Sequence, residues 1–306
     1  MKINSKSLIL NNLHKELITI DFSESCNNKC KNCPREQRIP DAINGNYWSL
    51  ENSKKLIDHI IKLCTPNEFH IGILSEFCIH PNAGEILSYL NTKYPNIKIT
   101  CTTNLTNMSD KLYEAVIKGN KNLTFNVSMW AWDYDSYLEL HGTNLFNKFN
   151  DNLEKLVSNI KIMKSNLMVS TVYINDNQHN SCINYLQNIS NKYNVNMKMR
   201  NDSRNSFGNN IFTVYTNVYT DTRDVASKNV DIRNSTLNYT KCNLPEYSAY
   251  ITYNRLYACP SSDTISKFDI NNLNDFDNKL AEIHMNGSKL DICKTCTVAY
   301  SCLNVR

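Results

Sequence analysis

The sequence predicts an α/β protein in which a partial (β/α)6 barrel precedes a small domain made of a β-hairpin and a helix. Three observations support this fold class. Strand-like and helix-like segments alternate over the first two thirds of the chain, the cysteines form an early and a late group, and a hairpin pattern lies within the late group. We expect the barrel over residues 1–205, a connecting segment over 206–240 and the small domain over 241–306.

The strand predictions depend on alternation of apolar and polar residues and on β-branched content. Leu17 to Ile20 alternates in this way and leads directly into the first cysteines. The expected strands of the barrel span residues 17–22, 68–74, 97–103, 123–129, 167–174 and 195–199.

The helix predictions depend on apolar residues at helical spacing and on residues that start or stop a helix. Ser49 or Glu51 can serve the first turn of one helix, in which Leu56, Ile57 and Ile60 recur on one face, and Pro95 stops the next. Strands that alternate with helices form a parallel sheet with right-handed crossovers, and ligands bind at the C-terminal ends of its strands. The expected helices span residues 49–64, 84–94, 109–118, 147–164 and 181–193.

The last third of the chain has a different pattern. Residues 206–240 are rich in Thr, Asn and Asp, and form the expected connecting segment, with room for some helix or strand. Residues 250–259 predict a hairpin in which Asn254 supplies the turn. A helix over 274–284 follows.

Composition limits the classes of function. The 306 residues carry a net charge of +4, and the charged residues are scattered, so neither nucleic acid nor a membrane surface is an expected partner. No stretch approaches the roughly 20 apolar residues that span a bilayer, and the N-terminus lacks the pattern of a signal peptide. We therefore expect a cytoplasmic protein, in which clustered cysteines among a total of 12 indicate metal binding instead of disulfides.

The early cysteines carry the most specific signal. Cys26 and Cys30 are separated by three residues, and Cys30 and Cys33 by two. One loop with this spacing can offer three thiolates to three irons of an iron–sulfur cube and leave the fourth iron open to a small molecule. The alternative is a structural zinc site whose fourth ligand lies elsewhere.

This cysteine run resembles the cluster motif of the radical S-adenosylmethionine (SAM) superfamily. The resemblance implies a [4Fe–4S] cluster held by Cys26, Cys30 and Cys33, with SAM on the open iron. It implies that SAM is cleaved reductively to a 5′-deoxyadenosyl radical, which abstracts hydrogen from the substrate, and that a flavodoxin or ferredoxin supplies the electron. Three segments after the second, third and fourth strands are similar to SAM-binding segments of the family, which implies cofactor contacts for Ser75, Glu76, Thr103, Asn104 and Ser128.

The chain also departs from the family pattern at the predicted SAM pocket. Asn32 stands where the family usually has an aromatic residue, and Leu105 stands where it has a glycine. Leu74 and Ser75 replace the two glycines that usually precede the glutamate.

The late cysteines resemble the auxiliary-cluster domain called twitch, a shortened form of the SPASM domain. The resemblance implies that Cys242, Cys259, Cys293 and Cys296 hold a second [4Fe–4S] cluster, with Cys302 spare or able to replace one of them. Zinc remains the alternative, because Cys-x-x-Cys pairs often bind it. The overall layout is similar to that of twitch-bearing dehydrogenases of butirosin biosynthesis, which oxidise an aminocyclitol.

Three functions follow from these readings. The first is oxidation of a small polar molecule, such as a sugar or aminocyclitol, in natural-product biosynthesis, with the second cluster taking up an electron. The second is epimerisation or cross-linking of a ribosomally made peptide. Peptide modifiers often carry a recognition domain before the cluster motif, and the 25 residues before Cys26 favour the small substrate. The third is a metal-binding protein without catalysis.

The remaining cysteines are assigned from their positions in the expected elements. Cys64 and Cys182 lie at apolar helix positions and are expected in the core. Cys78 and Cys101 lie near strand ends and are candidate hydrogen-atom donors to a substrate radical, as an epimerase requires.

Overall fold

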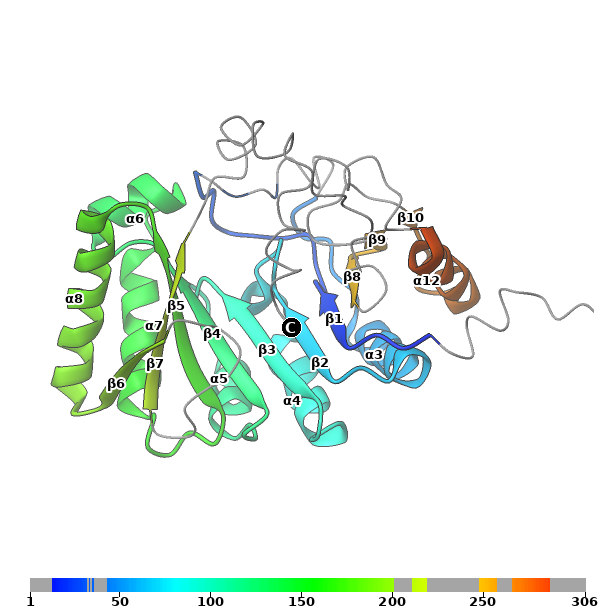
Figure 1. Cartoon of the computed structure of the whole chain (residues 1–306), viewed down its shortest axis with the longest axis horizontal. Coiled ribbons are helices and arrows are strands. Elements are labelled where there is room, and N and C mark those ends of the chain that lie inside the picture. The colour runs from blue at the N-terminus through cyan, green and yellow to red at the C-terminus, as the bar shows by residue number, and fades with distance from the viewer. Residues whose placement is uncertain are drawn as a thin grey trace, which may run out of the picture.

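The chain forms one open, largely parallel sheet with helices along it. The computed structural model describes residues 13–31, 33, 35, 43–200, 211–218, 248–257 and 266–286. Within these ranges the sheet has ten strands in the order β10-β9-β8-β1-β2-β3-β4-β5-β7-β6, and it is not closed into a barrel (Figure 1). The strands from β8 to β6 in this order pair in parallel, and only β9 and β10 are antiparallel to their neighbours. The α/β fold class predicted from the sequence is confirmed.

The elements follow one another along the chain as a strand-and-helix alternation. The strands are β1 (Leu17–Ile20), β2 (Glu68–Ile71), β3 (Lys98–Thr103), β4 (Leu123–Met129), β5 (Asn166–Tyr173), β6 (Asn196–Arg200), β7 (Ile211–Val218), β8 (Ser248–Thr252), β9 (Arg255–Tyr257) and β10 (Ser266–Lys267). The helices are α3 (Leu50–Cys64), the short 3-10 helix η1 (Phe77–Ile79), α4 (Ala83–Lys93), α5 (Asp110–Ile117), α6 (Tyr134–His141), α7 (Phe146–Ser158), α8 (Asp176–Tyr193) and α12 (Leu273–Asn286). None of the helices in the described part of the chain is long and apolar enough to cross a membrane.

Side chains at the helix starts explain where the helices begin. The Ser49 hydroxyl accepts a hydrogen bond from the backbone N–H of Asn52 at 3.1 Å and caps α3. The Ser109 hydroxyl caps α5 in the same way. Such caps satisfy N–H groups that the first turn of a helix leaves unpaired. The predicted starts at both serines are confirmed.

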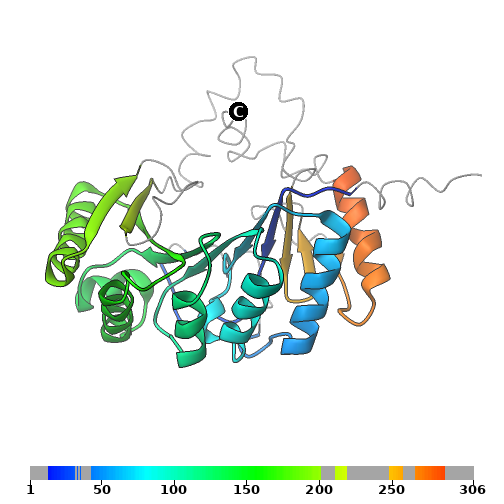
Figure 2. The ribbon, with the colours of Figure 1, turned by 90° about the horizontal axis from the view of Figure 1, so that it is seen from below.

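The two faces of the sheet differ in polarity. On one face, alternate residues of the central strands, such as Ile20, Phe69 and Val127, belong to a single buried core shared with the helices. Figure 2 shows helices α3, α4 and α5 along this outer face of the curved sheet. The opposite, inner face carries polar side chains from β1 to β5, here called the polar inner face: Thr19, His70, Thr102, Asn126, Ser128 and Ser170.

Two elements near the site were not among the predicted ones. Helix α6 begins in a capping box in which the Asp133 carboxylate accepts from the N–H of Ser136 and the Ser136 hydroxyl accepts from the N–H of Asp133. It ends at Gly142, whose φ of 66° is left-handed. Strand β7 lies within residues 206–240 and inserts between β5 and β6. From the order along the chain, β6 would be expected to pair with β5 directly.

The C-terminal hairpin belongs to the same sheet as the barrel strands. β8 pairs in parallel with β1, with Leu17 opposite Ser248 and Ile20 opposite Ile251. The predicted turn is confirmed, because Asn254 has a φ of 57° and connects β8 to the antiparallel β9. Through this pairing, residues about 230 positions apart in the sequence become neighbours at the end of β1.

Candidate functional site

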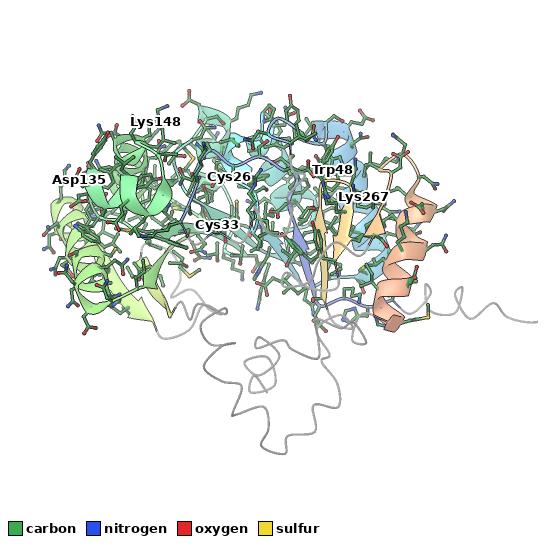
Figure 3. All side chains as sticks on the ribbon, turned by 90° about the horizontal axis from the view of Figure 1, so that it is seen from above. Cys26, Cys33, Trp48, Asp135, Lys148 and Lys267 are labelled. Atoms are coloured by element: carbon green, nitrogen blue, oxygen red, sulfur yellow. The ribbon has the colours of Figure 1, made fainter. Side chains whose placement is uncertain are left out.

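The early cysteines lie on a loop that follows β1, at the C-terminal end of the parallel strands. Cys26, Cys30 and Cys33 are each partly buried, and the backbone N–H of Cys33 donates to the carbonyl of Cys30 at 3.0 Å. Figure 3 shows Cys26 and Cys33 in the middle of the molecule, between Asp135 and Lys148 on one side and Trp48 and Lys267 on the other. Because the loop follows β1, it lies at the C-terminal edge of the parallel strands, where ligands of such sheets bind.

The electrostatics of the cysteine loop suit a cationic ligand. Burial, with added repulsion from Glu76 and the neighbouring cysteines, raises the pKa of Cys26 and of Cys30 to about 12. The free cysteines are therefore thiols, and a metal centre is needed to hold them as thiolates. In the described ranges no group of three His, Cys, Asp or Glu side chains is placed to share one metal ion. A cube does not require such convergence, since each thiolate binds a different iron.

Helix α6 holds one side of the cysteine loop through backbone contacts. The N–H of Lys29 donates to the carbonyl of His141 at 2.8 Å, and the N–H of Lys31 donates to the carbonyl of Leu140 at 3.0 Å. These carbonyls belong to the last turn of the helix, where they lack partners within the helix. At Gly142 a Cβ would lie 2.7 Å from the carbonyl oxygen of Lys29, so only glycine allows this approach.

Side chains of α6 and the segment after it reach the same loop. Asn28 donates from its amide to the Tyr137 hydroxyl at 3.1 Å, and its amide oxygen accepts from Thr143 at 2.9 Å. The Nδ1 atom of His141 lies 3.2 Å from Sγ of Cys30. Burial lowers the pKa of His141 to about 4, so its ring is neutral near pH 7.

Glu76 holds the other side of the loop. Its backbone N–H donates to the carbonyl of Ser25 at 2.8 Å. Its carboxylate accepts from the N–H of Cys78 at 2.9 Å, from the Thr103 hydroxyl at 2.7 Å and from the N–H of Asn104 at 2.6 Å. Burial raises the pKa of Glu76, and these hydrogen bonds act against the increase. The structure thus brings together three of the residues predicted to contact SAM: Glu76, Thr103 and Asn104.

Asn104 also contacts the cysteine loop directly. Its side-chain amide donates to Oδ1 of Asn27 at 2.9 Å, and the amide of Asn27 donates to Thr106 at 2.7 Å. Leu105, which takes the place of the family's glycine, has a φ of 59°. The turn after β3 therefore supports the loop between the first two cysteines.

The remaining predicted SAM contacts lie at neighbouring strand ends. Ser75 is buried, lies beside the Asp21 carboxyl group, and its hydroxyl has no hydrogen-bond partner of normal geometry in the described structure. The Ser128 hydroxyl accepts from Nε1 of Trp130 at 3.2 Å. Gly72, which follows β2, has a φ of 80°, and a Cβ there would meet the carbonyl oxygen of Thr102. This close approach brings the segments that contain Ser75 and Thr103 together.

Two acidic residues before the cysteines connect the loop to the C-terminal hairpin. The Asp21 carboxylate accepts from the N–H groups of Ile73 and Leu74 and from the Tyr250 hydroxyl, at 2.8, 3.0 and 2.8 Å. Glu24 forms a buried ion pair with Arg255, in which Nε and Nη2 lie 3.0 and 2.8 Å from Oε1. The sequence analysis did not single out Asp21, Glu24 or Arg255, because nothing in a single sequence relates the hairpin to the loop.

Four other cysteines lie in the protein core. Cys64 and Cys182 are completely buried, which confirms their predicted place in the core. Cys78 and Cys101 are also buried in that core, and burial raises the pKa of each well above the usual value. Both are therefore thiols, the form that carries a hydrogen atom. The late cysteines Cys242, Cys259, Cys293, Cys296 and Cys302 lie outside the described residues, as does Asn32.

Two cavities differ in their relation to the site. One of about 390 Å³ borders Cys26 and Asn27, and Tyr47 and His80 line its other side. A larger one of about 890 Å³ lies between α4 and α5 on the outer surface, and none of the early cysteines lines it.

Comparison with known proteins gives a family and a fold. The family model of the radical SAM superfamily matches residues 20–179, slightly more than half of the chain. The structure is similar to that of SuiB from Streptococcus suis, with a TM-score of 0.61 at 13% identity over 95% of this chain and 74% of that one. It is also similar to anSMEcpe with bound AdoMet and Cp18Cys peptide, with a TM-score of 0.50 at 13% identity over 92% and 86% of the two chains.

A third solved structure, BtrN in complex with AdoMet and 2-DOIA, has a TM-score of 0.47 at 12% identity over 92% of this chain and 93% of that one. No curated protein matches the chain. At such identities the structural similarity shows the fold, whereas the family model shows the family. The chain belongs to the radical SAM superfamily.

Proposed function

We propose that this protein is a radical SAM enzyme that cleaves SAM reductively and removes two hydrogens from a small polar substrate, such as a sugar or aminocyclitol. The observation that carries the proposal is the cysteine loop. Cys26, Cys30 and Cys33 lie together at the end of β1, on a loop that α6, the turn after β3 and the hairpin hold in place. With SAM on its open iron, a [4Fe–4S] cluster at these cysteines supplies a 5′-deoxyadenosyl radical under reduction.

The residues around the loop fit SAM. Glu76 is a buried acidic residue whose carboxyl group Thr103, Asn104 and Cys78 hold in place, and a carboxylate is a suitable partner for the SAM ammonium group. Ser75, the residue before Glu76, adds a buried hydroxyl beside Asp21. In this proposal Thr103 and Asn104 orient Glu76 and the cysteine loop, and Ser128 contributes a hydroxyl from the end of β4.

The polar inner face supports a small polar substrate. Thr102, Asn126 and Ser170 form a hydrogen-bonded row across three strands, with distances of 3.3 Å from Asn126 to Thr102 and 2.7 Å from Ser170 to Asn126. Thr102 immediately precedes Thr103, so the row lies next to the proposed SAM site. Hydroxyl and amide groups beside a binding site favour ligands that can hydrogen-bond to them.

We also propose a second [4Fe–4S] cluster, bound by Cys242, Cys259, Cys293 and Cys296, with Cys302 as an alternative ligand. Its role would be to take up the electron that a substrate radical loses on oxidation. The order of these four cysteines along the chain, with Cys293 and Cys296 as a Cys-x-x-Cys pair, supports this proposal.

The experiment that tests the proposal is anaerobic reconstitution of the full chain, followed by metal analysis and incubation with SAM and a reductant. We expect about eight irons, little zinc, and release of 5′-deoxyadenosine. Cys30→Ala should abolish the release, whereas Cys182→Ala, at a buried position on α8, should retain it. Bound zinc with no SAM cleavage would refute the proposal and favour a metal-binding protein without catalysis.

Modification of a peptide is the second candidate function. The observation in its favour is the similarity to SuiB, whose structure has also been determined bound to the precursor peptide SuiA. Mass spectrometry in deuterated water separates the two candidates. Loss of two hydrogens from a polyhydroxylated substrate supports oxidation, and gain of deuterium in a peptide without other mass change supports epimerisation. In the latter case Cys78→Ala or Cys101→Ala should abolish the gain if either thiol donates the hydrogen atom.

A further inference from the structure

His141 is positioned to act on the proposed cluster through one of its ligands. It is the last residue of α6, and its Nδ1 atom lies 3.2 Å from Sγ of Cys30. Its ring stacks on Tyr137 with centroids 4.2 Å apart and an interplanar angle of 28°. Its backbone carbonyl accepts from Lys29, one residue before Cys30. Stacking on Tyr137 and the backbone hydrogen bond to Lys29 therefore both fix the position of the ring relative to the sulfur.

We propose that His141 donates a hydrogen bond from Nδ1–H to the Cys30 thiolate and thereby raises the reduction potential of the cluster, which makes His141 a positioning residue. The inference is based on the proposed function, because it takes Cys30 as a cluster ligand. A thiolate accepts hydrogen bonds and cannot donate them, so the ring must carry a proton on Nδ1, the nitrogen that faces the sulfur. The Asn28 amide also approaches Nδ1, at the longer distance of 3.4 Å, and already donates to Tyr137.

The direction of the effect follows from charge. A hydrogen bond to a ligand sulfur withdraws electron density from it, and the reduced cluster carries one more negative charge than the oxidised one. The bond therefore stabilises the reduced form more, which raises the potential. Cys26 and Cys30 each receive a hydrogen bond from a backbone N–H, that of Asn28 and that of Cys30 itself. His141 is an additional donor at Cys30, and because it is a side chain a substitution can remove it.

Two variants separate the hydrogen bond from the packing. His141→Phe keeps an aromatic ring on Tyr137 and removes the donor, whereas His141→Asn places an amide nitrogen near the position of Nδ1 and retains a donor. The measurement is the midpoint potential of the reconstituted full chain, from a redox titration followed by electron paramagnetic resonance. The first cluster is identified as the one whose signal changes when SAM is added.

We expect His141→Phe to be about tenfold harder to reduce than the wild type, which corresponds to about 59 mV toward more negative potential for one electron. His141→Asn should lie close to the wild type. Equal potentials in the wild type and His141→Phe would overturn the inference, and so would equal shifts in both variants. If the wild type itself gives no SAM-dependent signal, the proposed function fails instead.

A second measurement decides the matter if His141→Phe does not retain its cluster. With ¹⁵N-labelled histidine, pulsed electron paramagnetic resonance of the reduced wild-type cluster should show coupling to one histidine nitrogen. The same label in His141→Asn should show none. Absence of the coupling in the wild type would overturn the inference.

Discussion

Arg255, in the C-terminal hairpin, donates two hydrogen bonds to the carboxylate of Glu24, two residues before the first cysteine of the cluster loop. Both side chains are almost completely buried, with 9% and 3% of their surface exposed. The other oxygen of Glu24 accepts from the backbone N–H of Ile43 and the side chain of Asn46. One carboxylate thus joins β9, the start of the cysteine loop and the segment before α3.

Removal of Arg255 should destabilise both the fold and the cluster loop. Arg255→Ala leaves the Glu24 charge buried without its partner, and we expect a loss of about 3–5 kcal/mol in the free energy of unfolding. The matched control is Lys118→Ala, which breaks the exposed ion pair with Glu114 and should cost less than about 1 kcal/mol. Chemical denaturation measures both, and metal analysis should show less iron in Arg255→Ala only. Equal stability of the two variants would contradict the role given to this ion pair.

Gly142 should be required for the cysteine loop. In Gly142→Ala the new Cβ would lie 2.7 Å from the backbone carbonyl oxygen of Lys29, so the loop or the end of α6 must shift. Gly45→Ala is the matched control, because Gly45 also has a positive φ, of 98°, but a Cβ there meets nothing within 4 Å. We expect reconstituted iron and SAM cleavage to fall in Gly142→Ala and to stay near wild-type values in Gly45→Ala. A larger loss of iron and SAM cleavage in Gly45→Ala would contradict this prediction. It would show that the positive φ, and not the contact with Lys29, determines the effect.

Glu76 should affect both stability and SAM use. In Glu76→Gln an NH2 group replaces one of the two acceptor oxygens, so at least one buried donor among its partners loses its hydrogen bond, at a cost of about 1–3 kcal/mol. Thr103→Val removes one of these donors and keeps the carboxylate, so it should lower stability with less effect on the concentration of SAM needed for half-maximal cleavage. The exposed Glu51 supplies the control Glu51→Gln, which should stay within about 0.5 kcal/mol of the wild type. If Glu76→Gln cleaves SAM with unchanged concentration dependence, Glu76 does not contact SAM.

Asp21 should make the fold less stable as the pH rises. Burial raises its pKa above the ordinary value of 3.8, so the folded state keeps a proton that the unfolded chain loses. Its stabilising contribution is therefore complete below pH 3.8 and declines as the pH rises through the folded pKa. Asp21→Asn should remove this decline, so its stability relative to the wild type should increase as the pH rises above 3.8. Parallel pH profiles from denaturation of the two proteins would contradict this account.

Local patterns in the sequence were sufficient for most of the barrel. The cap at Ser49, the alternation in β1 and the cysteine spacing each act over a few residues, so they can be read without knowledge of the fold. Helix α6 was missed because it is short and its first turn is polar, although the capping residue Asp133 and the terminal Gly142 were available as signals. A strand within residues 206–240 was allowed for, but the place of β7 between β5 and β6 was not predicted, because it depends on pairing with other strands.

The sequence by itself determined the family, the loop that carries Cys26, Cys30 and Cys33, and the place of Glu76 after the second strand. Only the tertiary structure decided what surrounds that loop. Arg255 meets Glu24 because β8 pairs with β1, and His141 meets Cys30 because α6 ends against the loop. Cluster ligands are recognised by spacing within one segment, but their burial, charge and hydrogen bonds come from segments that become neighbours only when the sheet and its helices assemble.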